Sequence, residues 1–193
     1  PDLQENRTMA PPRPENRWFI GFKHQGTVGR YLSTYVDFSK VSDDDYFYDF
    51  GGTGLNVASR NHLNQQGIVR FNSSKLRARL NVQRIQLIDP FLNRENIYKP
   101  YDRLPQFSFN TNTALPLGFK LALKGQFTAF DRELDESRLS PSLIERGVLV
   151  TGERAELEPR LSWSAESLGW FVRANASYQL TQYQLKNQAV GTL

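Results

Sequence analysis

The sequence predicts an all-β fold, an antiparallel up-and-down transmembrane β-barrel segment of about eight strands. Three observations predict it. Apolar and polar residues alternate with a period of two, many alternating runs are about ten residues long, and the connections between them are alternately short and long. Because successive side chains of a strand point to opposite faces, the alternation predicts one apolar and one polar face.

Four runs lie in the first half of the chain. Apolar residues fall at every second position in 18–22, 32–38 and 76–82, and a shorter run at 69–71 carries only Val and Phe. The run at 76–82 is the clearest, because Lys, Arg and Asn are interleaved with its apolar residues. A helix would mix the two sets on every face.

Four further runs lie in the second half. The run at 107–113 alternates Phe and Thr with Ser and Asn, and 119–127 alternates Phe and Leu with Lys and Gln. Leu and Trp alternate with Glu and Arg in 155–163, and a last run covers 170–180. Soluble strands usually have about five or six residues, while a membrane-spanning strand needs about nine to eleven. Length therefore favours a membrane barrel.

The connections support the same fold. Short links are expected at 25–29, 72–75, 115–118 and 164–168, and long ones at 39–66, 87–104 and 130–152. An outer-membrane barrel has tight periplasmic turns and longer outer loops. All long loops should therefore lie at one end.

Composition excludes other classes. The net charge of +4 is too small and too scattered to predict a nucleic-acid partner, and the chain has no cysteine for a disulfide or a thiolate metal site. The proline-rich segment 1–15 is expected to be an unstructured lead-in, and 16–193 a partial outer-membrane β-barrel domain. Because the chain opens on Pro1, we expect a processed chain or a fragment.

No catalytic residue, cofactor or metal site is predicted. Asp43 to Asp45 lack the spacing of an EF-hand, and the aromatic run 46–50 that follows indicates a folded loop anchored by its rings. Nothing brings His24 and His62 together. The chain is therefore not expected to be an enzyme.

Cations on the polar face are the candidate contact residues. They are Lys75, Arg77, Arg79, Lys120, Lys124, Arg160 and Arg173. In a barrel they would face the lumen, where cations can bind phosphate or carboxylate groups. The alternative is a hydrated wall in which they pair with Glu156 and Glu158.

A few residues depart from the alternation. Arg84 is the main charge on the apolar faces and is expected near a strand end, where a long side chain can reach the membrane interface. Trp18, Trp163 and Trp170 fit an aromatic girdle, or simply reflect the preference of aromatics for strands.

Several short motifs carry a family resemblance. In order, they are Asn16-Arg17-Trp18, the stretch DFSKVSD at 37–43, Tyr46-Phe47, Asp49-Phe50, YDRLPQ at 101–106, Gly152-Glu153-Arg154, Leu157-Glu158-Pro159 and Tyr178-Gln179-Leu180. This succession, over about residues 16–185, resembles the LptD family (also OstA or Imp) of outer-membrane lipopolysaccharide assembly proteins.

The resemblance implies that the segment is part of a larger barrel in the bacterial cell outer membrane. The family's lipoprotein LptE plugs the lumen, and lipopolysaccharide arrives over a periplasmic bridge that includes LptA. It leaves by a lateral gate, and no bond is made or broken. The basic candidates would then contact lipopolysaccharide or the plug, the apolar face would contact membrane lipid, and LptA would bind a domain absent from this sequence.

Two alternatives remain open from the residues alone. One is a small self-contained eight-stranded outer-membrane barrel, acting as a structural anchor or a lipid-modifying enzyme, since eight strands can close around a filled interior. The other is a soluble β-sandwich binding module.

Overall fold

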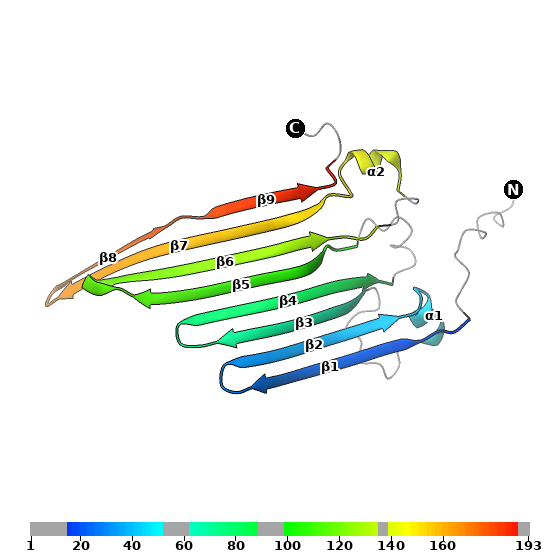
Figure 1. Cartoon of the computed structure of the whole chain (residues 1–193), viewed down its shortest axis with the longest axis horizontal. Coiled ribbons are helices and arrows are strands. Elements are labelled where there is room, and N and C mark those ends of the chain that lie inside the picture. The colour runs from blue at the N-terminus through cyan, green and yellow to red at the C-terminus, as the bar shows by residue number, and fades with distance from the viewer. Residues whose placement is uncertain (1–14, 52–61, 89–98, 135–138, 189–193) are drawn as a thin grey trace.

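The computed structural model describes residues 15–51, 62–88, 99–134 and 139–188, which form one antiparallel sheet (Figure 1). The strands are β1 (Phe19–Val28), β2 (Leu32–Val41), β3 (His62–Asn72), β4 (Leu76–Leu87), β5 (Asp102–Ala114), β6 (Phe119–Asp131), β7 (Thr151–Ser167), β8 (Trp170–Ser177) and β9 (Leu180–Lys186). The helical elements are α1 (Tyr46–Phe50), η3 (Pro116–Gly118) and α2 (Pro141–Glu145). None of the described helices is long and apolar enough to cross a membrane.

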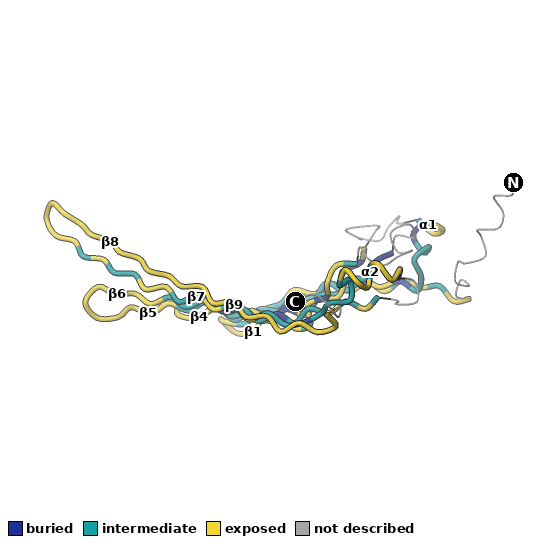
Figure 2. Tube along the Cα trace, turned by 90° about the horizontal axis from the view of Figure 1, so that it is seen from above, coloured by how far each residue is buried: buried dark blue, intermediate teal, exposed yellow. Residues whose placement is uncertain are grey.

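The strands are hydrogen-bonded in chain order from β1 to β8, with β9 also on β7, so the predicted all-β up-and-down arrangement is confirmed. Within the described ranges, β1 pairs with β2 alone, and β8 and β9 pair with β7 alone. The sheet is therefore open. Seen from above, its strands lie in a single thin layer (Figure 2). The described chain thus forms neither a closed eight-stranded barrel nor a two-layer sandwich.

Strand β3 is longer than the sequence indicates. It has 11 residues, whereas the alternation predicts only 69–71. The reason is composition, because Gln65 and Gly67 occupy positions on the face that Val69 and Phe71 make apolar, and Ile68 lies on the other face. Neither face of 62–68 therefore carries a continuous apolar or polar row.

The predicted strand 170–180 contains β8 and only the first residue of β9, so the strand continues further than predicted and is divided in two. The pairings of β8 and β9 with β7 share one register, since Arg160 lies opposite Ser177 and Leu157 opposite Leu180. Pro159 lies opposite Tyr178 between them. The Tyr178 amide donates to the Pro159 carbonyl over 3.1 Å, but proline has no N–H to return the bond. The break therefore follows from one missing donor.

The connections alternate as predicted. Short ones at 29–31, 73–75, 115–118 and 168–169 lie at one end of the sheet, and α1 and α2 belong to long connections at the other (Figure 1). We call these the turn end and the loop end. The predicted lead-in lies outside the described residues except for Glu15.

Cross-strand partners share a face, so the register defines two surfaces. Large apolar residues of the apolar face include Phe22, Val36, Val69, Leu80, Phe107, Leu121, Leu161 and Val172. The charged face includes Lys23, Asp37, Arg70, Arg77, Arg79, Lys120, Lys124, Glu156, Glu158, Arg160 and Arg173. The predicted separation of apolar and polar residues is therefore observed.

The buried core is small and lies near the loop end, where the dark residues of Figure 2 gather. Val41, Phe47, Leu63 and Ile88 are buried there. Elsewhere the apolar face is open, and Phe22 remains 55% exposed. The body of the sheet thus presents an uncovered apolar surface.

Candidate contact surface on the charged face

The seven predicted cations all lie on, or directly before, strands of the charged face. Arg77 and Arg79 are on β4, Lys120 and Lys124 on β6, Arg160 on β7 and Arg173 on β8, while Lys75 directly precedes β4. Antiparallel registers place the six strand residues on one side of the sheet, because partners across each strand pair point the same way.

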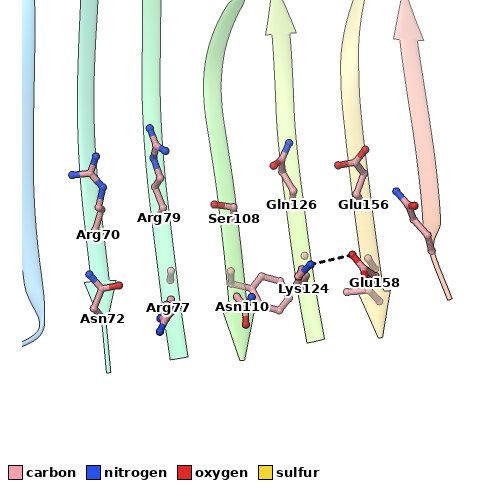
Figure 3. Close-up of a pocket in the computed structure, with 15 residues that line it drawn as sticks. Arg70, Asn72, Arg77, Arg79, Ser108, Asn110, Lys124, Gln126, Glu156 and Glu158 are labelled. Carbon is pink, nitrogen blue, oxygen red and sulfur yellow. Dashed lines mark hydrogen bonds and ion pairs between the residues drawn. The ribbon is translucent and has the colours of Figure 1, made fainter. Parts of the chain in front are cut away.

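Two transverse rows form the centre of this surface (Figure 3). From β3 to β7, the row nearer the turn end is Asn72, Arg77, Asn110, Lys124 and Glu158. The next row is Arg70, Arg79, Ser108, Gln126 and Glu156. Both rows line a shallow pocket. The pocket therefore includes Arg77, Arg79 and Lys124 but none of the other predicted cations.

Part of the surface is internally neutralised. The Glu158 carboxylate lies 2.8 Å from a guanidinium nitrogen of Arg160 and 3.5 Å from Nζ of Lys124. Glu156 lies 3.3 Å from Nε of Arg154. Lys124 and Arg160 thus show the pairing with Glu158 that the sequence left open as an alternative.

The side nearer β3 lacks such compensation. Among the described residues, no hydrogen bond or ion pair reaches the guanidinium groups of Arg70, Arg77 or Arg79. Arg70 lies directly opposite Arg79. The sequence-based selection missed Arg70, although its place between Val69 and Phe71 already indicated the polar face.

Toward the loop end, uncharged amide and hydroxyl side chains occupy the centre of the same face. Asn81 and Thr128 are buried there, at 1% and 0% exposure. Hydrogen bonds between side chains connect β2 to β5. Asn64 donates to Asp37 over 3.2 Å and accepts from Gln83 over 2.9 Å. Gln66 donates to Asn81 over 2.8 Å, and Asn81 donates to Gln106 over 3.3 Å. These bonds satisfy the buried and half-buried polar groups of this region. The one carboxylate among them, Asp37, also lies 3.8 Å from Nζ of Lys23.

Arg17 anchors the loop that contains α1. Its guanidinium donates to both Asp43 carboxylate oxygens, at 2.6 and 2.9 Å, and to Asp49 at 2.6 Å. Phe47 is buried and its ring lies 5.8 Å from that of Phe19. The predicted folded loop with aromatic anchors is confirmed.

This anchor also changes proton affinities. Burial by itself raises the pKa of Asp43, but hydrogen bonds from Arg17 and Ser42 outweigh it and hold that pKa below its usual value. The hydrogen bonds to Asp43 and Asp49 in turn raise the pKa of Arg17. The loop is therefore held by a fully ionised contact at neutral pH.

Charges on the apolar face are found near the loop end. Arg84 lies opposite Asp102 at 3.5 Å, and Lys186 lies 3.4 Å from Glu153. The position expected for Arg84, near a strand end, is therefore correct. At the turn end, the indole N–H of Trp163 donates to the Leu117 carbonyl over 3.0 Å.

Comparison with known proteins identifies relatives of the whole segment. The family model LPS transport system D (LptD) matches residues 15–192. The LPS-assembly protein LptD of Pseudomonas aeruginosa UCBPP-PA14 is 30% identical over 203 residues, which cover 98% of this chain and 21% of that protein. LPS-assembly proteins LptD of Pseudomonas putida and Pseudomonas syringae pv. syringae B728a are each 28% identical, again over 98% of this chain and 22% and 21% of theirs. The chain thus spans about a fifth of the length of these curated relatives.

Proposed function

The chain belongs to the LptD family, and from this premise we propose that it forms part of the wall of an outer-membrane β-barrel that delivers lipopolysaccharide to the outer leaflet. The role is transport, with no bond made or broken. The observation that carries the proposal is a single-layer sheet with one exposed apolar face and one charged face.

The uncovered apolar face indicates that the sheet is in contact with something other than water. Soluble monomers rarely expose contiguous apolar patches larger than a few hundred Å². Here large apolar side chains stay exposed across the sheet, among them Leu80 at 43% and Leu161 at 41%. Contact with lipid would cover them, while the charged face would meet the water-filled lumen.

Strand length agrees with this assignment. The strands from β1 to β7 have 10 to 17 residues, and a tilted membrane-spanning strand needs about nine to eleven. The ion pairs of Arg84 and Lys186 would mark the outer membrane interface. The loop end would then face the cell exterior and the turn end the periplasm.

The open edges explain why we propose a part of a barrel. An unpaired strand edge in lipid leaves backbone N–H and C=O groups without partners. We expect the free edges of β1, β8 and β9 to pair with other strands of a larger barrel. Relatives about five times as long have room for those strands.

The partners follow from the same assignment. We expect the charged face to contact lipopolysaccharide or the LptE plug, and the apolar face to contact outer-membrane lipid. LptA would bind a periplasmic domain outside this sequence. Segment 16–193 would then be a portion of the barrel domain.

Photo-crosslinking tests the assignment of the two faces. Benzoylphenylalanine would be placed at Lys120 and Arg173 on the charged face, and at Leu121 and Val172 on the apolar face. Each pair of sequence neighbours lies at the same depth, so depth is controlled. In cells expressing the native protein, only the first pair should capture lipopolysaccharide or the plug. Equal capture from both faces would reject the lumen assignment.

A further inference from the structure

Three arginines form a compact cationic group on β3 and β4. Arg70 and Arg79 are direct cross-strand partners, and Arg77 is on the same face of β4, two residues nearer the turn end (Figure 3). Neutral polar residues surround them. Asn72 lies opposite Arg77 on β3, while Asn110 and Ser108 lie opposite Arg77 and Arg79 on β5.

This group is not compensated by the described part of the chain. Lys124 and Arg160 share Glu158, yet no carboxylate of the described residues pairs with Arg70, Arg77 or Arg79. The nearest acidic residue of Arg79's own row is Glu156, three strands away. At about 4.8 Å per strand, the separation is roughly 14 Å.

Like charges directly opposite each other destabilise a sheet. The folded sheet therefore keeps Arg70 and Arg79 together at a cost in free energy that a bound anion would offset. Both residues line the shallow pocket, so an anion there has access to their guanidinium groups.

The donors present select a class of anion. A guanidinium offers a planar fork of N–H groups that matches phosphate oxygens in a bidentate way. The amides of Asn72 and Asn110 and the Ser108 hydroxyl can donate to or accept from sugar hydroxyls. Three guanidinium groups favour a phosphate, which carries up to about two negative charges, over a carboxylate, which carries one. The neutral polar groups beside them fit an attached saccharide.

We infer that Arg70, Arg77 and Arg79 form a binding site for a phosphorylated saccharide headgroup. This inference rests on the proposed function, because the charged face must meet lipopolysaccharide for such a headgroup to reach it. The inference divides the cations predicted from the sequence into two groups. Arg77 and Arg79 contact the ligand, whereas Lys124 and Arg160 are paired with Glu158.

The test uses a photo-crosslinker at Ser108 in the native protein, with a second at Lys120 as the reference for lipopolysaccharide in the lumen. Capture of lipopolysaccharide at Ser108 is measured in the wild type and in R70Q/R79Q. The matched control K23Q/R160Q removes the same number of positive charges from the same face, but from paired residues outside the pocket. With purified wild-type protein, intact and chemically dephosphorylated lipopolysaccharide are compared, with and without inorganic phosphate as competitor.

Capture at Ser108 should fall about tenfold in R70Q/R79Q and stay near the wild-type level in the control, as expected when charge-assisted hydrogen bonds are removed. Dephosphorylated lipopolysaccharide should be captured about tenfold less, a comparison that needs no variant to fold. Competition by inorganic phosphate would support the inference, because it would show that the site binds the phosphate group itself.

Equal losses in both double variants, or equal capture of the dephosphorylated lipid, would overturn the inference. Capture of a protein instead of lipopolysaccharide at Ser108 would overturn it as well. If Lys120 captures lipopolysaccharide while Ser108 is insensitive to the arginines, only the inference fails. If neither position captures it, the proposed function fails too.

Discussion

The ring of Phe109 lies over Gly125, its direct cross-strand partner on the apolar face, and occupies the space that a side chain at Gly125 would fill. Phe109 on β5 thereby covers the gap that glycine leaves in β6. The packing of the Phe109 ring therefore requires glycine at position 125.

Gly125→Val should therefore displace the Phe109 ring and lower the free energy of unfolding by about 1–3 kcal/mol, the usual cost of overpacking. Gly67→Val is the matched control, because Gly67 is a strand glycine of the same face with nothing within 4 Å of its added Cβ. Urea unfolding in detergent micelles measures both. A larger loss from the Gly67 variant would contradict this packing.

Pro159→Ala should join β8 and β9 into one strand. The new N–H would donate to the Tyr178 carbonyl and complete the pair that now has a single bond, adding about 1 kcal/mol. Hydrogen exchange should show protected amides at positions 159 and 178. An unprotected amide at 159 would mean that the missing donor is not the cause of the break.

The Arg17 anchor should depend on pH. Because the pKa of folded Asp43 lies below its ordinary value of 3.8, the contact contributes fully above that value and is lost as the pH falls through the lower, folded pKa. Amide protection of Asp49 in α1 and of Gly51 directly after it should fall over that range. In Arg17→Gln, protection should already be low at neutral pH and change little on acidification, whereas wild-type protection in this variant would exclude the anchor.

Removal of the Asp102 carboxylate should lower the free energy of unfolding more than removal of the Glu158 carboxylate, although both residues form ion pairs. The Asp102 side chain is 3% exposed and accepts the Ile85 backbone N–H at 2.9 Å, so Asp102→Ala leaves this half-buried donor unsatisfied and should cost about 1–3 kcal/mol. Glu158 pairs on an open surface, and Glu158→Gln should cost at most about 1 kcal/mol. Unfolding in micelles compares them, and equal costs would contradict the account.

Much of the sheet could be predicted because the face to which a strand residue points depends only on its position within its own strand. A period of two in 76–82, 107–113 and 119–127 assigns each side chain to a face before any pairing is known. The predicted ends were less accurate. Strand β7 extends to both sides of 155–163, since Glu153 and Glu166 continue the strand without continuing an apolar pattern.

The contact surface was predictable only in part. The face of Arg77 and Lys124 follows from their own strands. Which cation finds a carboxylate depends on register between strands far apart in sequence, as in Lys124 and Glu158. Arg70 shows the same limit, because its closeness to Arg79 arises only when β3 pairs with β4.

The most direct test of the membrane wall is a spin-label scan of β6, a central strand in a chain without cysteine. Labels at single cysteines would be placed at positions 120 to 127 of the native protein in lipid bilayers, with the exception of Gly125, which has no room for a side chain. We predict that odd positions are relaxed by oxygen, which concentrates in lipid, and that even positions are relaxed by a water-soluble nickel complex. Odd positions that the nickel complex reaches, or that neither reagent reaches, would contradict a lipid-facing sheet.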